Sequence, residues 1–258
     1  LNNLGALYRL TGRYEEAEPL FKRALDIDTE ALGDDHPSTA VDMNNLAILY
    51  MDMGRYDESE DLYRRAGGIW MAVLPADHPY VAQAMNNLGI LYRTVGRYQD
   101  AETLFAEALS ILEKGLPPTH PYIGLTCNNL GTLYTQTEHY AEAEPLFRRS
   151  LTIMEQSLPP GHPDLAQSMT NLATVCGDLG RHEEAEGLYK RALTMCEETL
   201  PPDHPLTQTA RNNLGLLYLE MGRYHGARAQ CLKALAGSEK TLGPDHPKTT
   251  VTVGNLML

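Results

Sequence analysis

Six histidines recur at a fixed spacing and are the first residues in this sequence that could do chemistry. Each stands directly before a proline, and the six are His36, His78, His120, His162, His204 and His246. Zinc needs its ligands at about 2.0–2.1 Å, whereas packed helices lie about 8–10 Å apart. One histidine per 42 residues therefore cannot form a shared metal site. We predict no metal and assign these histidines to helix capping and linker geometry.

The four cysteines offer no better case for catalysis. Cys127, Cys176, Cys196 and Cys231 form no Cys-x-x-Cys pair, so they indicate reduced, buried thiols and a cytoplasmic setting. The sequence contains no Gly-x-Ser-x-Gly, P-loop, His-Glu-x-x-His or dinucleotide-binding motif. We therefore expect no catalytic residue, no cofactor and no enzyme activity in this chain.

Asparagine pairs form a third periodic set. They occupy 2–3, 44–45, 86–87, 128–129 and 212–213, and weaken to Thr170-Asn171 and Gly254-Asn255. A primary amide offers both donors and an acceptor. A row of such amides can hydrogen-bond the N–H and C=O groups of an extended peptide, whatever the side chains of that peptide are.

These residues share one period, which defines the domain organisation. The His-Pro dipeptide returns every 42 residues without insertion or deletion, so one structural unit is stacked repeatedly. We expect a single solenoid over 1–258 with no internal domain boundary. Its predicted repeats are a partial one at 1–36, full ones at 37–78, 79–120, 121–162, 163–204 and 205–246, and a partial one at 247–258.

Each repeat is expected to hold two helices. After His78, Pro79 suits a first helical position, and Val81, Met85, Leu88 and Tyr92 recur at helical spacing. Gly96 is a typical helix stop. A second helix follows each such turn; in the first repeat it begins at an acidic stretch, where carboxylates suit the helix dipole, and it runs to about residue 32.

Aromatic residues also follow the repeat, and we interpret nearly all of them as packing. Trp70 lies outside these columns, three residues after Gly67-Gly68. Two interpretations remain open for it. The ring fills the gap that the glycines leave in the core, or the helix kinks there and exposes the ring to a partner.

The residues of the repeat resemble a known family. Leu4-Gly5, Tyr8, Ala17, Phe21 and Ala24 match the tetratricopeptide pattern. The 42-residue length, the Asn-Asn-Leu opening and the Leu-Gly-x-x-His-Pro linker resemble the kinesin-light-chain type in particular. This resemblance implies an all-α, right-handed superhelical solenoid of antiparallel helix pairs, with the first helices of the repeats lining a concave groove.

The resemblance also implies which positions face that groove. They are the two residues before the motif leucine of each first helix and those two, five and six after it. The residues we expect to bind a peptide there are Asn44, Asn45, Asn86, Asn87, Ile90, Arg93, Asn128, Asn129, Thr132, Gln136, Asn171, Asn212 and Asn213. The alternative is that one asparagine of each pair bonds within the array and only the other faces a ligand.

Charge narrows the partner further. Asp and Glu number 34 against 21 Lys and Arg, for a net charge of −13, which argues against nucleic acid. No apolar run reaches the roughly 18–20 residues of a membrane helix. In the groove only Arg93 is cationic, with Arg9 at its edge. The kinesin-light-chain preference for acidic peptides is therefore not expected, and the groove is amide-rich and mildly apolar.

These observations favour a non-catalytic scaffold that binds a peptide or extended protein segment through an asparagine ladder. One alternative is a regulatory or self-associating segment of a larger signalling protein whose groove is filled by its own chain. Another is the non-catalytic part of an enzyme whose active site lies elsewhere. Both ends of the sequence cut a repeat in half, so we expect an excerpt of a longer array and self-association through the cut ends as a further possibility.

Overall fold

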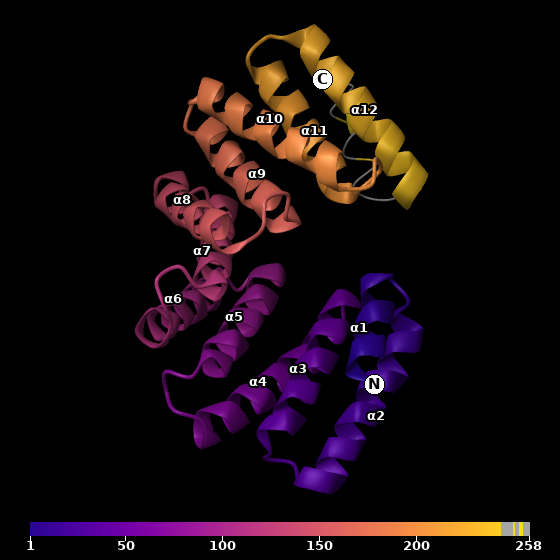
Figure 1. Cartoon of the computed structure of the whole chain (residues 1–258), viewed down its shortest axis with the longest axis vertical. Helices are drawn as coiled ribbons and strands as arrows, with labels where there is room; N and C mark the ends of the chain where they lie inside the picture. The colour runs from indigo at the N-terminus through magenta and orange to yellow at the C-terminus, as the bar shows by residue number, and fades with distance from the viewer. Residues whose placement is uncertain (244–249, 251–252, 255–258) are drawn as a thin grey trace. The chain divides into compact units, whose positions relative to one another are not determined.

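The computed structural model describes residues 1–243, 250 and 253–254 as a series of α-helices (Figure 1). His246 and most of the expected final partial repeat at 247–258, Asn255 included, lie outside the described residues. Within the described part there are twelve helices and no strand, which confirms the all-α class. They are α1 (Asn2–Leu10), α2 (Tyr14–Leu32), α3 (Pro37–Asp52), α4 (Tyr56–Val73), α5 (Pro79–Thr94), α6 (Tyr98–Gly115), α7 (Pro121–Gln136), α8 (Tyr140–Ser157), α9 (Pro163–Asp178), α10 (His182–Thr199), α11 (Pro205–Glu220) and α12 (Tyr224–Leu242).

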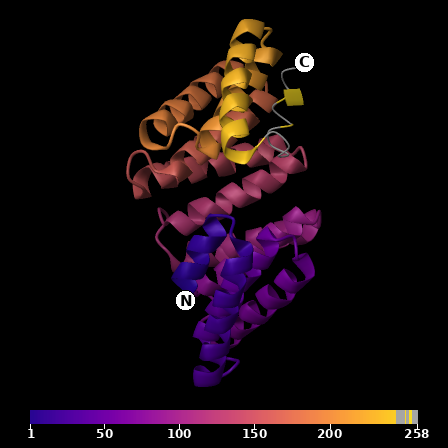
Figure 2. The same ribbon diagram turned by 90° about the vertical axis from the view of Figure 1, so that its right-hand side faces the viewer.

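The helices group into two compact units, Leu1–Pro118 and Thr119–Leu258, and each is described here by itself. In both units the helices of a repeat pack on each other, and within a unit the first helix of one repeat contacts the second helix of the repeat before it: α3 with α2, α5 with α4, α9 with α8 and α11 with α10 (Figures 1 and 2). First helices of successive repeats also touch: α1 with α3, α3 with α5, α7 with α9, and α9 with α11. The single uninterrupted solenoid and its superhelical sense stay predictions.

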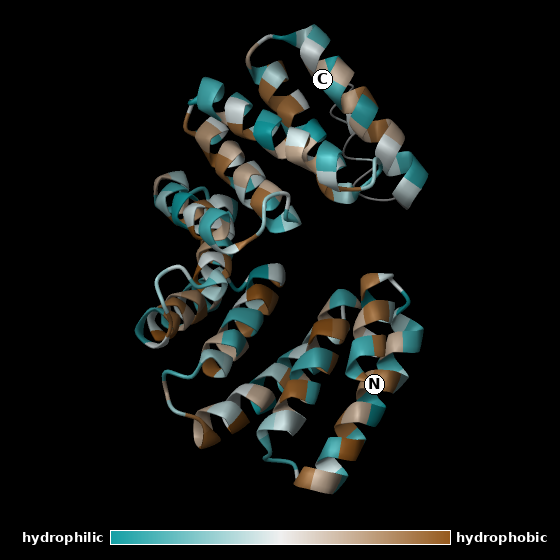
Figure 3. Cartoon of the chain, viewed as in Figure 1, coloured by the Kyte–Doolittle hydropathy of each residue, from teal (hydrophilic) through white to brown (hydrophobic). Residues whose placement is uncertain are grey.

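Hydrophobic and polar residues are mixed along each helix (Figure 3). The buried ones join neighbouring helices; the cluster around Phe147, Met169 and Leu214, for example, draws on four helices of the second unit. No helix in the described ranges is both long enough and apolar enough to cross a membrane.

The first helices of the repeats begin at the His-Pro dipeptides, as the sequence predicted. In all five described cases the histidine is the N-cap and its Nδ1 accepts a hydrogen bond from the backbone N–H two residues later, as His78 does from Tyr80 at 3.2 Å. The proline that follows occupies the first turn, where a missing N–H costs nothing. The histidines are therefore capping residues, as predicted, because each supplies an acceptor to an otherwise unpaired donor.

Trp70 fills the core as the first of the two interpretations expected. Helix α4 continues through Gly67 and Gly68, and the Trp70 side chain is 1% exposed. Its Nε1 donates to the Pro37 carbonyl oxygen at 3.3 Å, and its ring lies 5.4 Å from that of Tyr80.

The four cysteines are also buried and unpaired with one another; burial raises the pKa of Cys176 to about 11.

A recurring polar clamp joins neighbouring repeats. In α2, Glu18 accepts from the Tyr50 hydroxyl at 3.2 Å and from Arg55 Nη1 at 2.9 Å, and the Arg55 guanidinium lies 3.8 Å from the Tyr50 ring centroid. The same set recurs around Glu60 and Glu186. In the fifth repeat Cys176 replaces the tyrosine, but Arg181 still pairs with Glu144 at 2.6 Å.

The clamp makes the stability of the fold depend on pH. Hydrogen bonds from Arg181 and Arg148 outweigh burial and lower the pKa of Glu144, whereas an unfolded glutamate titrates near about 4.3. The carboxylate therefore stabilises the fold above that value, and the contribution is lost as the pH falls through the lower folded-state pKa. We expect Glu144→Gln to flatten the pH dependence of the free energy of unfolding between about pH 5 and 3, measured by urea titration; an unchanged slope contradicts this.

The turns between paired helices need a left-handed residue. Glycine supplies it in five of them, with φ between +71° and +83° at Gly12, Gly54, Gly96, Gly180 and Gly222. In the fourth repeat Glu138 takes φ +63° instead. A side chain in this region costs about 1–2 kcal/mol, so this turn is strained where the others are not.

Replacing that residue should relieve the strain. We expect Glu138→Gly to stabilise the protein by about 1 kcal/mol in thermal or urea unfolding, after allowing for the greater freedom of glycine in the unfolded chain. Gly96→Glu is the mirrored control and should destabilise by a similar amount, because Gly96 has φ +83° and open space around its Cβ position. Equal stabilities of Glu138→Gly and wild type would show that the turn is unstrained.

Candidate functional site

The expected groove positions lie on one side of the first helices, which we call the first-helix face. Helical geometry places residues three or four apart on the same side of a helix. The core residues of these helices occupy the other sides, so this side is not taken up by the core. Ile48, Ile90 and Leu216 are half-buried there, while Glu220 is exposed. The face is thus a partly open surface rather than part of the core.

Amide–amide hydrogen bonds join asparagines of neighbouring repeats at two places, one in each unit. Asn87 Nδ2 donates to Asn44 Oδ1 at 2.8 Å, and Asn171 Nδ2 donates to Asn128 Oδ1 at 2.8 Å. In both cases the second asparagine of one repeat bonds the first of the preceding repeat. Asn44 is only 3% exposed, so its amide serves the array and is closed to a ligand.

Other contacts replace the amide–amide bond elsewhere. Asn2 donates to Asp42. Thr170 stands in the first position of the fifth repeat, is buried, and donates to the Ala166 carbonyl oxygen of its own helix at 2.8 Å. Asn213 instead interacts with the Tyr189 hydroxyl. The ladder bond is therefore replaced by a contact to the second helix.

The remaining predicted residues occupy a range of environments. Asn45 is half-buried and makes no side-chain hydrogen bond among the described residues, while Asn86, Asn129 and Asn212 are half-buried and partnered. Ile90 is half-buried, Gln136 is exposed, and the Thr132 hydroxyl donates to the Asn128 carbonyl oxygen at 2.8 Å. Arg93 is half-buried, and burial lowers the pKa of its guanidinium.

Charged residues on this face differ between the two units. In the first unit, Arg9 Nη1 pairs with Asp52 Oδ2 at 2.6 Å. In the second unit, Asp178 and Glu220 have no ion pair with any described cationic side chain. Burial and the charge of Glu220 raise the pKa of Asp178. On the first-helix face, the negative charge of Asp52 is therefore balanced in the first unit, whereas the negative charges of Asp178 and Glu220 are unbalanced in the second unit.

A cavity of about 170 Å³ lies beside these carboxylates. Its lining residues come from α9, α10 and α11 and are Thr174, Gly177, Asp178, Tyr189, Asn213, Leu216, Leu217 and Glu220. The sequence identified the face but missed the cavity. The available signals were Gly177, where other repeats carry a side chain, and a tyrosine at 189 where the first repeat has Phe21.

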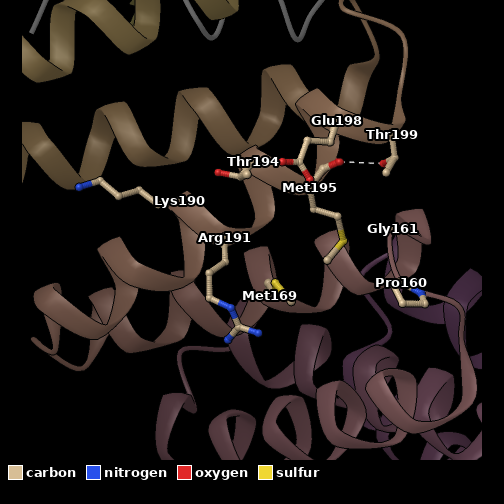
Figure 4. A pocket seen from close by; sticks show the side chains of 9 residues that line it. All are labelled: Pro160, Gly161, Met169, Lys190, Arg191, Thr194, Met195, Glu198 and Thr199. Atoms are coloured by element: carbon tan, nitrogen blue, oxygen red, sulfur yellow. Dashed lines mark hydrogen bonds between the residues drawn. The ribbon is translucent and has the colours of Figure 1, made fainter.

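Another cavity, of about 610 Å³, lies against α10, the second helix of the fifth repeat, and against the linker that joins the fourth repeat to the fifth (Figure 4). Met169, Arg191 and Met195 are among the side chains around it. A cavity of about 460 Å³ has Met43, Arg65 and Ile69 at the corresponding positions three repeats earlier. Because the same register yields both, this feature follows from how a linker meets a second helix and does not indicate a dedicated site.

The described residues contain no group of three or more His, Cys, Asp or Glu side chains arranged to hold a metal ion. The histidines are spent on capping, as shown above, and burial raises the pKa of Cys176, Cys196 and Cys231, which disfavours reactive thiolates. The residues of interest are therefore those that can hydrogen-bond and pair charge.

A stack of antiparallel helix pairs with a 42-residue period defines a helical-repeat scaffold, the kind of fold that serves protein–protein interaction. Family models described as tetratricopeptide repeat match residues 1–66, 42–114, 119–198 and 207–248. The chain belongs to the tetratricopeptide repeat family. A search among proteins of curated function finds no significant match.

Solved structures agree with this assignment. The kinesin-light-chain-type, nearly identical TPR-like repeats from Podosopora anserina are 25% identical, with a TM-score of 0.67 over 80% of this chain and 98% of that one. BtubC (BKLC) from P. vanneervenii gives a TM-score of 0.75 at 20% identity, over 91% and 94% of the two chains. YrrB, a TPR protein with an unusual peptide-binding site, gives 0.53 at 19% identity, over 91% and 98%. The 42-residue repeats are thus similar to those of kinesin-light-chain-like tetratricopeptide proteins.

The ladder makes the two asparagines of a pair unequal, which can be measured. Asn44→Ala removes the acceptor of Asn87 from a buried site, and we expect it to lower the free energy of unfolding by about 1–2 kcal/mol. Asn45→Ala should change it by less than about 0.5 kcal/mol. Urea unfolding followed by circular dichroism compares the two; similar values would show that the internal bond contributes nothing.

Proposed function

We propose that this chain is a non-catalytic binding module that holds an extended peptide or protein segment along the first-helix face. The family supports a scaffold role, and one structural neighbour, YrrB, is described as having a peptide-binding site. The observation that carries the proposal is that amides of the ladder are fixed in position while part of their hydrogen-bonding capacity is unused.

Asn87 and Asn171 illustrate this arrangement. Each gives one N–H to the preceding repeat, and a primary amide has two such donors. Asn171 Oδ1 also accepts from Gln167 at 2.8 Å, whereas Asn87 Oδ1 has no partner among the described residues. Each amide therefore keeps a donor for a ligand, and Asn87 keeps its acceptor as well.

Fixing an amide before binding lowers the cost of using it. A free side chain loses about 0.5–1.5 kcal/mol of rotamer freedom when a ligand immobilises it. The bond to Asn44 or Asn128 has already restricted the amide. Such groups suit the backbone of an extended segment, because every residue of that segment presents an N–H and a C=O. Asn44 and Asn128 then act as positioning residues behind the amides that touch the ligand.

The finer expectations belong to the same proposal. A single solenoid over 1–258, a cytoplasmic setting within a larger signalling protein, and the absence of catalysis all fit a module whose work is binding. The net charge of −13 disfavours nucleic acid as the partner. A protein segment remains as the ligand that the amide chemistry favours.

The test is capture of peptides from a random seven-residue library by immobilised protein. Asn87→Ala combined with Asn171→Ala removes one fixed amide from each unit. Each lost hydrogen bond of about 1 kcal/mol predicts a roughly fivefold fall in affinity for the peptides bound to that unit, measured by fluorescence anisotropy.

A matched control removes two amides from the second helices. Gln99 and Gln156 are exposed on α6 and α8, so Gln99→Ala with Gln156→Ala should leave peptide affinity unchanged. Full binding by the asparagine double variant, with both variants folded by circular dichroism, would show that the first-helix amides are not the binding groups. Loss in both variants would point to the second-helix side instead.

A further inference from the structure

The first repeats contain an ion pair that serves as an internal template. Arg9 at the end of α1 and Asp52 at the end of α3 lie on neighbouring first helices, with Nη1 and Oδ2 2.6 Å apart. Both side chains are about a quarter exposed, at 26% and 27%. Here the array supplies its own guanidinium to the carboxylate of the next repeat.

Four repeats later the arginine is missing but the acid remains. Because the period is a constant 42 residues, Gly177 stands at the position of Arg9 and Glu220 at that of Asp52. Asp178 stands where the first repeat has Leu10, which adds a second carboxylate. The fifth repeat therefore lacks the arginine side chain, which leaves its space unfilled, and the negative charge around that space is higher than in the first repeats.

The cavity of about 170 Å³ lies at this place and is lined by residues of α9, α10 and α11. A water molecule occupies about 30 Å³ of liquid, so the volume corresponds to roughly six waters and suits an arginine side chain beyond its Cβ. Leu216 and Leu217 offer apolar surface for its methylene stem, as amphipathic side chains prefer.

The polar groups of the cavity match a guanidinium. When ionised, Asp178 and Glu220 are hydrogen-bond acceptors only, and Arg presents five N–H donors in a planar fork that suits carboxylates. The Tyr189 side chain is 4% exposed, and its hydroxyl lies 2.8 Å from Thr174 Oγ1 at the inner end. An acidic side chain would meet two like charges here, so charge complementarity selects a cation.

We propose that this cavity, the arginine subsite, receives an arginine side chain of the segment held on the first-helix face of the second unit, with Glu220 and Asp178 as its carboxylate partners. The subsite rests on the proposed function for its physiological ligand. Its chemistry can nevertheless be tested without a peptide.

The first test uses N-acetyl-L-arginine methylamide as a probe and its citrulline analogue as the neutral isostere. In NMR titrations of the whole chain, the amides of Gly177 and Glu220 should shift and saturate with arginine at a Kd at least fivefold below that for citrulline. Equal titration by the two probes, or no shift at either residue, overturns the subsite.

The second test fills the cavity from within. Gly177→Arg restores the residue found at Arg9 and should pair with Glu220, abolishing the arginine-specific shift at Glu220. Gly177→Ala is the matched control: a Cβ at Gly177 meets only Leu217 Cδ1, at an ordinary 3.6 Å, so probe binding should persist. Both variants replace a helical glycine and should unfold at a temperature no lower than wild type, which separates occlusion from unfolding. Undiminished probe binding by a folded Gly177→Arg contradicts the assignment.

Peptides distinguish the subsite from the general function. Library peptides captured by wild type should be enriched in arginine, and Gly177→Arg or Glu220→Gln should remove that enrichment. Capture without arginine preference means that the subsite is wrong while the amide face stands. An arginine-specific probe titration without any peptide capture means that the proposed function is wrong while the cavity chemistry stands.

Discussion

The close approach of the two helices within each repeat is the constraint on which the rest of the structure depends. A glycine of the first helix faces an aromatic ring of the second, and a Cβ built on Gly89 would lie 2.8 Å from the Phe105 ring. The same contact is 3.0 Å for Gly5 against Phe21 and for Gly131 against Phe147. Since a Cβ at these distances would force the ring to shift, the paired helices of these three repeats meet almost backbone to ring. In these repeats the contact fixes how closely the two helices pack.

The second and fifth repeats vary this contact in a consistent way. Alanine replaces glycine at Ala47 and Ala173, and the ring is then that of Tyr63 or Tyr189. Both tyrosines are buried, at 1% and 4% exposed. In the fifth repeat the hydroxyl reaches the first-helix face and contacts Thr174. A packing residue thereby supplies the polar inner end of the cavity, so core and site are not independent in this fold.

Sequence reasoning predicted most of the fold because its signals are repeated. Pro79 after His78 and the turn at Gly96 recur in register. Each helix boundary is therefore indicated by several repeats, and a weak signal in one repeat is compensated by the others. The prediction did not resolve which amide of a pair is buried, because Asn44 and Asn45 are adjacent and chemically identical. Only the stacking of the next repeat, through Asn87, separates them. Likewise, Glu138 in a left-handed turn departs from a pattern without revealing that the turn keeps its geometry.

The candidate site shows why departures from a repeat carry functional information. A regular array positions each column by packing, so a residue can change on the first-helix face without moving the helix that carries it. Exchanging an arginine for Gly177 leaves the fold intact while exposing a carboxylate that the equivalent arginine neutralises elsewhere. Selection for stability alone would fill such a place, since a helical glycine costs about 1 kcal/mol relative to alanine. The first unit, with Arg9 against Asp52, shows that this array can accommodate the filled version. The vacancy in the second unit is therefore better explained by a ligand group than by packing.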